Sequence, residues 1–208
     1  MKIKGWEKIY KEKGEVYPNI ISQVKKYAKI FKRKKYKKIL DLGCGTGRNS
    51  IFLAQHGFMV YASDISKTGI AITKKKAKSL NLNIKFKIYD MKKLPHATNY
   101  FDAVICIFSL GHGLLKDNQK IIDEVYRVLK PKGTIVTEFM SVKDKTCGRG
   151  KEVEKNTFLG SMEEDKHMMH HYFTREEIKM LFSKFTMLKI SSKEYFGEIK
   201  AFDVEAIK

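Results

Sequence analysis

The stretch Ile39–Ser50, ILDLGCGTGRNS, joins a short apolar run to a loop in which glycine recurs at positions 43, 45 and 47. Glycine has no Cβ atom, so a backbone with this spacing can come close to a bound ligand. The next residues, NSIFLAQHG, predict a helix that ends at Gly57 and whose N-terminus faces the same loop. We therefore predict a strand, a ligand-binding loop and a helix in succession.

The spacing of the glycines separates this loop from the dinucleotide-binding fingerprint. That fingerprint, G-x-G-x-x-G, has its last glycine one position later, where a helix packs closely against a strand. Arg48 occupies that position here. Its bulk argues against a cofactor with a pyrophosphate, so a nicotinamide-dependent oxidoreductase is disfavoured.

Strand and helix patterns alternate along the chain. Hydrophobic periodicity predicts helices over 18–33, 66–80 and 117–130 and after Thr174, and further strands over 58–62, 84–89, 101–108, 134–139, 187–191 and 201–207. This alternation predicts an α/β fold, a mostly parallel seven-stranded sheet with helices on both faces and an antiparallel C-terminal strand. We expect a single domain over 1–208, with an N-terminal helical cap over 1–36 and an irregular insertion or lid over 140–173 on the substrate side.

The acid before the glycines completes the pattern Asp-x-Gly-x-Gly-x-Gly, and Asp64 follows about 20 residues after the loop. In these features the sequence resembles the class I S-adenosylmethionine-dependent methyltransferases. The continuation GRNSIFLAQHGFMVYASDIS, together with WEKIY near the start, looks like their tellurite-resistance and thiopurine-type small-molecule branch. The resemblance implies a Rossmann-like fold, S-adenosylmethionine as the cofactor and S-adenosylhomocysteine as its product.

The resemblance also implies roles for residues at the strand ends. Asp64 would accept the ribose hydroxyls and Ile65 would pack on the adenine, with a solvated strand-end acid as the alternative. Asp90 would receive the adenine amino group, although a turn-forming role is also possible. The full set expected at the cofactor is Trp6, Tyr10, Asp41, Gly43, Cys44, Gly45, Gly47, Arg48, Asn49, Asp64, Ile65, Asp90, Met91, Ile107 and Phe108. Trp6 and Tyr10, spaced i and i+4, either cover the cofactor or simply dock a terminal helix.

Methyl transfer from a sulfonium is an in-line displacement, so the protein mainly aligns the reactants and excludes water. A soft nucleophile needs little further help, whereas an oxygen or nitrogen nucleophile can require a general base. The candidates are His112 and, from the segment HMMHHYF, His170 and His171. Related enzymes often carry two consecutive histidines near position 112, where this chain has Gly111–His112. The histidine segment lacks metal-ligand spacing with Cys147, so we expect no metal.

The net charge is +19, and residues Lys25–Lys38 contain no acid. One interpretation is a track for RNA or an anionic surface; the other is lysine decoration of every solvated face, since lysines recur throughout the chain. The stretch after the fourth strand reads IFSLGHG and lacks the (D/N)-PP-(Y/F/W) tetrad of many nucleic-acid amino-group methylases. A small-molecule acceptor is therefore favoured over RNA or protein, and a non-catalytic S-adenosylmethionine-binding protein remains an alternative.

The three cysteines are far apart, and the sequence shows neither a signal-peptide pattern nor an apolar run long enough to span a membrane. These features favour a cytoplasmic protein with no membrane partner. A monomer or a homodimer is expected.

Overall fold

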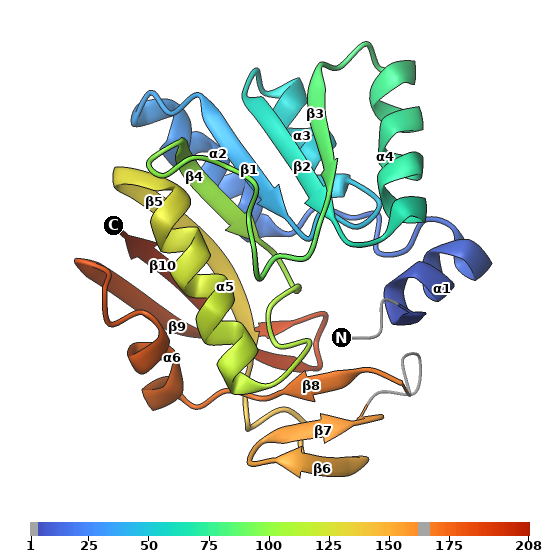
Figure 1. Ribbon diagram of the computed structural model, residues 1–208, viewed down its shortest axis with the longest axis vertical. Helices are drawn as coiled ribbons and strands as arrows, with labels where there is room; N and C mark the ends of the chain where they lie inside the picture. The colour runs from blue at the N-terminus through green and yellow to red at the C-terminus, as the bar shows by residue number, and fades with distance from the viewer. Residues whose placement is uncertain (1–3, 162–166) are drawn as a thin grey trace.

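The computed structural model describes residues 4–161 and 167–208, and a seven-stranded sheet is its main feature (Figure 1). The strands follow the order β3 (Ile84–Ile88), β2 (Met59–Asp64), β1 (Lys38–Leu42), β4 (Phe101–Cys106), β5 (Leu129–Met140), β10 (Ile199–Ile207) and β9 (Met187–Tyr195). Strand β10 is antiparallel to both β5 and β9, whereas the neighbouring pairs from β3 to β5 are parallel. The predicted α/β class and the antiparallel C-terminal strand are confirmed.

The strand order reverses between β1 and β4. From β1 the chain moves outward to β2 and β3, crosses back to β4 and then moves outward to β5 on the other side. Connections that leave two central strands in opposite directions open a crevice at the carboxyl ends of those strands. A ligand site is therefore expected next to Leu42 and Cys106, the last residues of β1 and β4.

Helices cover both faces of the sheet (Figure 1). Two apolar clusters place α2 (Ser22–Arg33), α3 (Arg48–Gln55) and α4 (Lys67–Ser79) on one face, and α5 (Leu115–Val128) and α6 (Arg175–Leu181) on the other. Ile39 of β1 belongs to the first cluster and its neighbour Leu40 to the second. This alternation follows from the twofold period of side chains along a strand.

The helix predicted over 18–33 begins later, at Ser22. Ile21 is extended (φ −73°, ψ 148°), and the segment before it gives its carbonyl groups to the glycine loop. Arg48 Nη1 donates to the carbonyl oxygens of Tyr17 (2.9 Å) and Asn19 (3.2 Å). Because these carbonyl groups tie the segment to the start of α3, they do not enter a helix, and the prediction for residues 18–21 is wrong.

The insertion over 140–173 contains a three-stranded antiparallel sheet. The prediction that it is irregular is therefore wrong. Its strands are β6 (Lys151–Glu154), β7 (Thr157–Leu159) and β8 (Met169–His171). The base of the insertion is closed, because Phe173 N donates to the Met140 carbonyl (2.7 Å) and Val142 N donates to the Phe173 carbonyl (3.1 Å). His171 N also donates to the Gly111 carbonyl (2.8 Å) and joins the small sheet to the loop after β4.

Two local predictions near the C-terminal half had different outcomes. The helix predicted after Thr174 is confirmed as α6, and it begins with a capping box: Thr174 Oγ1 accepts from Glu177 N, and the Glu177 carboxylate accepts from Thr174 N. Strand β5, predicted from Thr134, begins at Leu129 directly after α5. Leu129 pairs with Phe101 ahead of a register shift, so Pro131 and Gly133 lie within an irregular part of the strand.

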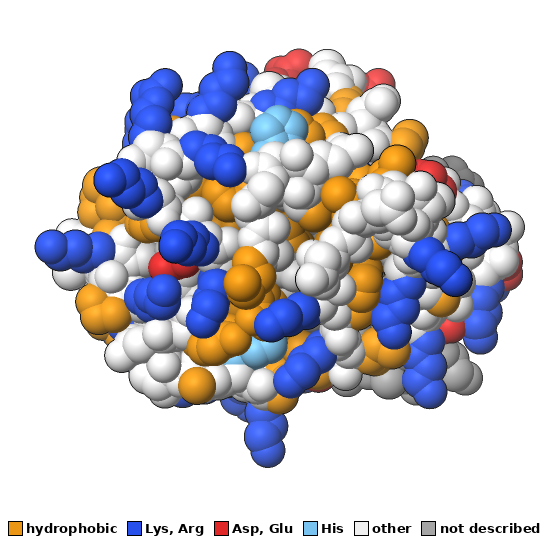
Figure 2. Space-filling view, turned by 90° about the horizontal axis from the view of Figure 1, so that it is seen from above, with side chains coloured by type: hydrophobic (Ala, Val, Ile, Leu, Met, Phe, Trp, Pro, Cys, Tyr) orange, Lys and Arg blue, Asp and Glu red, His pale blue; other side chains and the backbone are white. Residues whose placement is uncertain are grey.

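Lysine and arginine side chains are spread over the face at the amino ends of the strands, which Figure 2 shows from above. Residues 32–35 and Lys37, at the end of α2 and in the turn before β1, are exposed. Several lysines lie over aromatic rings, as Lys38 does over Tyr100 (4.1 Å). The predicted basic run over Lys25–Lys38 thus lies away from the carboxyl ends of the strands.

Candidate active site

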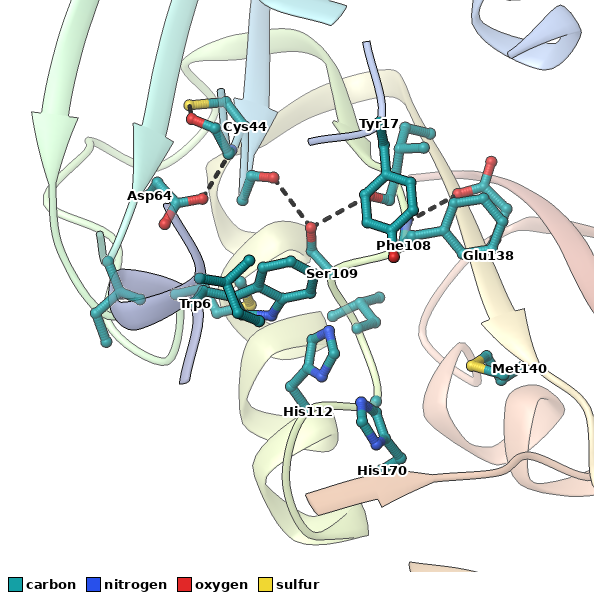
Figure 3. A pocket seen from close by; sticks show the side chains of 18 of the residues that line it. Trp6, Tyr17, Cys44, Asp64, Phe108, Ser109, His112, Glu138, Met140 and His170 are labelled. Carbon is teal, nitrogen blue, oxygen red and sulfur yellow. Dashed lines mark hydrogen bonds between the residues drawn. The ribbon is translucent and has the colours of Figure 1, made fainter. Parts of the chain in front are cut away.

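A cavity of about 420 Å³ lies at the carboxyl ends of the central strands (Figure 3). Its wall is built from the loops after β1, β2 and β4, the end of β5, the helix α1 (Lys4–Lys13) and the insertion. No residue between Tyr17 and Gly43 lines it, so the basic run over Lys25–Lys38 takes no part in this wall. The volume is in the range of pockets that hold small molecules and cofactors.

The glycine loop forms the floor of the cavity. Gly43 and Gly45 have φ angles of +75° and +55°, which favour glycine. A Cβ atom on Gly43 would lie 2.4 Å from Ser109 Oγ, and one on Gly45 would lie 2.6 Å from the Tyr10 hydroxyl. The N–H groups of Gly43 and Cys44 both donate to the Ser63 carbonyl, which fixes the loop to the end of β2.

Two residues assigned to the cofactor do not line the cavity. Gly47 lies behind the wall, where a Cβ atom would be 2.1 Å from Thr73 Cγ2, so the glycine permits α3 and α4 to approach. Asp41 is buried and its Oδ2 accepts from Ser50 Oγ (2.5 Å). Burial raises the pKa of Asp41 to about 7, despite the hydrogen bond from Ser50. In this structure both residues support the loop, and their contact with the cofactor stays a prediction.

Asp64 lines the cavity at the end of β2 and is held rigidly by the backbone. Its Oδ2 accepts from Gly45 N and its Oδ1 from Ser66 N, both at 2.8 Å. Burial raises its pKa, and the backbone hydrogen bonds from Ser66 and Gly45 oppose that shift. A carboxylate oxygen can accept more than one hydrogen bond, so this fixed group can also receive a pair of ligand hydroxyls.

The neighbouring wall at the ends of β2 and β3 consists of Ile65, Asp90 and Met91. Asp90 Oδ1 accepts from Lys92 N (2.9 Å), so this residue forms a turn and also lines the cavity. An apolar side chain and a carboxylate here offer one flat packing surface and one acceptor. Their roles toward an adenine ring stay predictions.

Helix α1 covers the cavity with Trp6, Ile9 and Tyr10. The rings of Trp6 and Tyr10 are stacked with centroids 5.5 Å apart, and Tyr10 is buried over the glycine loop. The sequence left two interpretations of Trp6 and Tyr10, docking of a terminal helix and covering of the ligand site. The structure is compatible with both, because the helix docks onto the domain and its aromatic residues also face the cavity.

Glu7 provides the docking contact of α1. Its Oε2 accepts from Ser66 Oγ (2.6 Å) and from Thr68 N (3.1 Å), and its Oε1 accepts from Thr68 Oγ1 (2.8 Å). Ser66 and Thr68 begin helix α4, whose N-terminus favours a negative charge. Partial burial would raise the pKa of Glu7, but the hydrogen bonds outweigh it and lower the pKa to about 2.

All three candidate histidines contribute to the wall, but in different ways. His112 follows β4 and lies edge-on to His170 of β8, with ring centroids 4.9 Å apart, and to Trp6 at 5.7 Å (Figure 3). His171 is turned to the interior of the insertion, where its Nδ1 lies 2.6 Å from Thr157 Oγ1 and its ring meets Phe173. The adjacent residues His170 and His171 thus make different contacts.

Sequence reasoning missed a carboxyl group in the wall. Glu138 lies near the end of β5, is 1% exposed, and its Oε2 accepts from Phe108 N (3.3 Å; Figure 3). Burial and the neighbouring Asp203 raise its pKa well above 4.5. The sequence did offer one signal for Glu138, because an acidic residue stands within the largely apolar run TIVTEFM. Phe108, whose N–H it accepts, has a φ of +51°, an uncommon conformation for a residue with a side chain.

The loop after β4 is held in place by a second missed residue, Ser109. Its hydroxyl donates toward the carbonyl oxygens of Gly43 (3.0 Å) and Ile107 (3.2 Å). Ile107, Phe108 and Ser109 all line the cavity. The glycine loop and the end of β4 thereby form one continuous surface.

Within residues 4–161 and 167–208, no group of three or more His, Cys, Asp or Glu side chains is arranged to hold a metal ion. Cys44, Cys106 and Cys147 are free thiols. In the same part of the chain, no helix combines the length and apolarity needed to cross a bilayer.

The chain shares its fold with solved structures of S-adenosylmethionine-dependent methyltransferases. Residues 39–133 match a family model described as a methyltransferase domain. A crystal structure of a Methanosarcina mazei S-adenosylmethionine-dependent methyltransferase superposes with a TM-score of 0.75 at 24% identity, over 91% of this chain and 98% of that one. TehB from Haemophilus influenzae superposes with a TM-score of 0.69 at 20% identity, over 98% of this chain and 67% of that one.

A curated relative extends the similarity at the level of sequence. The ubiquinone biosynthesis O-methyltransferase of Coxiella burnetii is 35% identical over 101 residues, which cover 49% of this chain and 42% of that protein. The matching region spans less than half of that relative. These comparisons show a methyltransferase domain over residues 39–133 and a fold shared with solved methyltransferases.

Proposed function

We propose that this protein transfers a methyl group from S-adenosylmethionine to a small-molecule nucleophile. The observation that carries the proposal is that one cavity gathers every residue assigned to the cofactor except Asp41 and Gly47. These residues come from α1 and from the loops after four different strands. A shared wall of this kind is what binding of one extended ligand requires.

In the proposed placement the adenine packs between Ile65 and Met91, and its amino group donates to Asp90. The ribose hydroxyls donate to Asp64. The amino-acid part follows the glycine loop toward Ile107 and Phe108, beneath α1. This order matches the order of the strands, because β3, β2, β1 and β4 are consecutive neighbours in the sheet.

The acceptor would occupy the side of the cavity bounded by His112, His170 and the insertion. The cofactor supplies an activated methyl group, so the protein's own contribution is to align the acceptor and exclude water. For an oxygen or nitrogen acceptor, His112 or His170 would take the proton. A thiolate or a metalloid oxyanion would need no base.

A small acceptor is preferred because α1 and the insertion enclose the cavity, while the basic run over Lys25–Lys38 lies elsewhere. The motifs WEKIY and GRNSIFLAQHG support the tellurite-resistance and thiopurine-type branch of the family. We expect α1, which belongs to the helical cap predicted over 1–36, and the insertion over 140–173 to act as the two covers of the reaction space.

Calorimetric titration of S-adenosylhomocysteine into the wild type and Asp64→Ala tests the cofactor site, with NAD as a control ligand. We expect micromolar binding to the wild type and a loss of at least about 100-fold in the variant, because hydrogen bonds to a charged group contribute roughly 1.5–3 kcal/mol each. Asp123→Ala, which removes an exposed partner of Lys184, is the matched control and should bind normally.

Absence of binding to the folded wild type would refute the proposed function. If binding is found, turnover with methyl-labelled cofactor and a panel of thiols, metalloid oxyanions, phenols, amines and RNA identifies the acceptor. Labelling of RNA alone would overturn the small-molecule assignment.

A further inference from the structure

Glu138 uses only one of its carboxyl oxygens within the described residues. Oε2 accepts the Phe108 N–H, whereas Oε1 is buried and receives no hydrogen bond from residues 4–161 or 167–208. A buried polar atom without a partner costs about 1–3 kcal/mol, so such atoms are rare unless they have a function. Glu138 is among the residues that line the cavity.

Among the described residues, no cationic side chain forms an ion pair with Glu138. Asp203 is its cross-strand neighbour on β10 and adds negative charge, while Asp203 itself bonds to the Tyr195 hydroxyl. Arg48 lies within electrostatic range and stabilises the charged form of Glu138, but its Nη1 is committed to the carbonyl groups of Tyr17 and Asn19. The carboxyl group is thus buried, and one of its oxygens accepts no hydrogen bond. A ligand group with several donors would supply that hydrogen bond.

A second acceptor belongs to the same wall. Asn49, in the first turn of α3, lines the cavity, is 4% exposed, and its Oδ1 also receives no hydrogen bond from the described residues. An ammonium group carries three donors and a positive charge, so it can serve several acceptors at once. A neutral hydroxyl carries one donor and no charge.

We propose that Glu138, supported by Asn49, receives an ammonium group of a bound ligand. The inference rests on the proposed function, because it takes the cavity to be the methyltransferase site. It adds a binding residue on β5 to the set that sequence motifs identify. The bound ammonium would supply the positive charge that the folded chain does not place against Glu138.

Two sources of an ammonium group fit the position of Glu138. Strand β5, which carries Glu138, lies three strand spacings from β2, which carries Asp64. The two strands are therefore about 14 Å apart. The amino-acid tail of the cofactor points in this direction in the proposed placement. An amine acceptor bound beyond the reacting methyl group would reach the same wall from the side of the insertion.

A purely structural role would account for Oε2 alone. Holding Phe108 in its left-handed conformation requires one acceptor, which a glutamine provides equally well. Glu138→Gln therefore preserves the shape and the contact to Phe108 and removes the negative charge. The variant should fold and melt like the wild type, as circular dichroism would verify.

The experiment titrates wild type and Glu138→Gln with S-adenosylhomocysteine and with 5′-methylthioadenosine, which lacks the amino-acid tail. A third titration, at saturating S-adenosylhomocysteine, uses 2-phenylethylamine and its neutral counterpart 2-phenylethanol as probes of an acceptor amine. Asp203→Asn is the matched control, because it neutralises the adjacent carboxyl group that does not line the cavity. It should leave all affinities within about twofold, which is less than 0.5 kcal/mol.

A loss of tenfold or more for S-adenosylhomocysteine, with 5′-methylthioadenosine unchanged, would support the proposal and identify the cofactor tail as the source. Unchanged S-adenosylhomocysteine binding with selective loss of 2-phenylethylamine would support it and identify the acceptor. The proposal is overturned if wild type and Glu138→Gln bind all four probes equally. Failure of the wild type to bind S-adenosylhomocysteine is a different result, since it refutes the proposed function first.

Discussion

Replacing Glu7 by glutamine should release helix α1 from the cavity without unfolding the domain. The carboxylate of Glu7 accepts three hydrogen bonds, two from Thr68 and one from Ser66, and these join α1 to the start of α4. Glutamine retains the shape and one acceptor oxygen but loses the charge. Because hydrogen bonds to charged groups contribute roughly 1.5–3 kcal/mol, we expect docking of α1 to weaken by about that amount.

If the ligand binds only when α1 is docked, weaker docking lowers the affinity for the ligand. The apparent Kd rises by the factor by which the docked fraction falls, and each 1.4 kcal/mol corresponds to a tenfold change in the docking equilibrium. We therefore expect S-adenosylhomocysteine to bind up to about 100-fold more weakly to Glu7→Gln. The thermal midpoint should change little, because the apolar clusters of the sheet contain no residue of α1.

The chain contains one tryptophan, Trp6, and it lies on α1 over the cavity, so its fluorescence reports docking. In Glu7→Gln we expect a red-shifted emission that ligand partly reverses. The matched control is Glu12→Gln on the same helix, since Glu12 is exposed and pairs loosely with Lys8 at 3.8 Å. Equal emission and equal Kd in the two variants would refute the docking role of Glu7.

The wild type should show the same release in acid. The folded pKa of Glu7 is lowered from 4.5 to about 2, so its stabilisation of docking is complete above pH 4.5 and is lost as the pH falls toward 2. Trp6 emission should shift in this window and be flat in Glu7→Gln. Far-ultraviolet circular dichroism, recorded in parallel, distinguishes release of α1 from global unfolding.

Two further substitutions test the support of the glycine loop. Gly47→Ala should destabilise the fold by about 2–4 kcal/mol, because the residue has a φ of +84° and its Cβ atom would meet Thr73; a urea midpoint equal to that of the wild type would contradict this. Asp41→Asn should be stabilising above pH 7, because an acid whose folded pKa is raised to about 7 destabilises the fold as the pH rises from 4 through 7. Its advantage in thermal midpoint should grow between pH 5 and pH 8, and a constant difference would show that Asp41 does not titrate in this range.

The strand, the glycine loop and the ends of β2 and β3 could be predicted because local spacing determines them. Gly43, Gly45 and Asp64 are separated by fixed numbers of residues, and parallel strands bring their carboxyl ends to one edge of the sheet. The motif did not distinguish residues that face the ligand from those that support the loop. Asp41 and Gly47 match the pattern as well as Gly43 does, yet the structure uses them for contacts to Ser50 and Thr73.

The insertion and Glu138 could not be predicted because non-local contacts determine both. Strands β6, β7 and β8 have three or four residues each, which is too short for a hydrophobic period to appear. The role of Glu138 depends on the register that brings β5 beside β10 and on the loop that presents the Phe108 N–H. Neither the register nor the loop geometry can be read from the residues around position 138.

The closed base of the insertion has an evolutionary consequence. The chain leaves β5 at Met140, and a bridge between Ser141 and Phe173 holds the two ends of the insertion together. A segment with adjacent ends can be lengthened, shortened or exchanged at small entropic cost to the domain that carries it. The segment matched by the family model, 39–133, ends before this exit point. In the proposed function the insertion bounds the acceptor side of the cavity, so exchanging residues 141–173 for the corresponding segment of a relative should change the acceptor and leave the glycine loop intact.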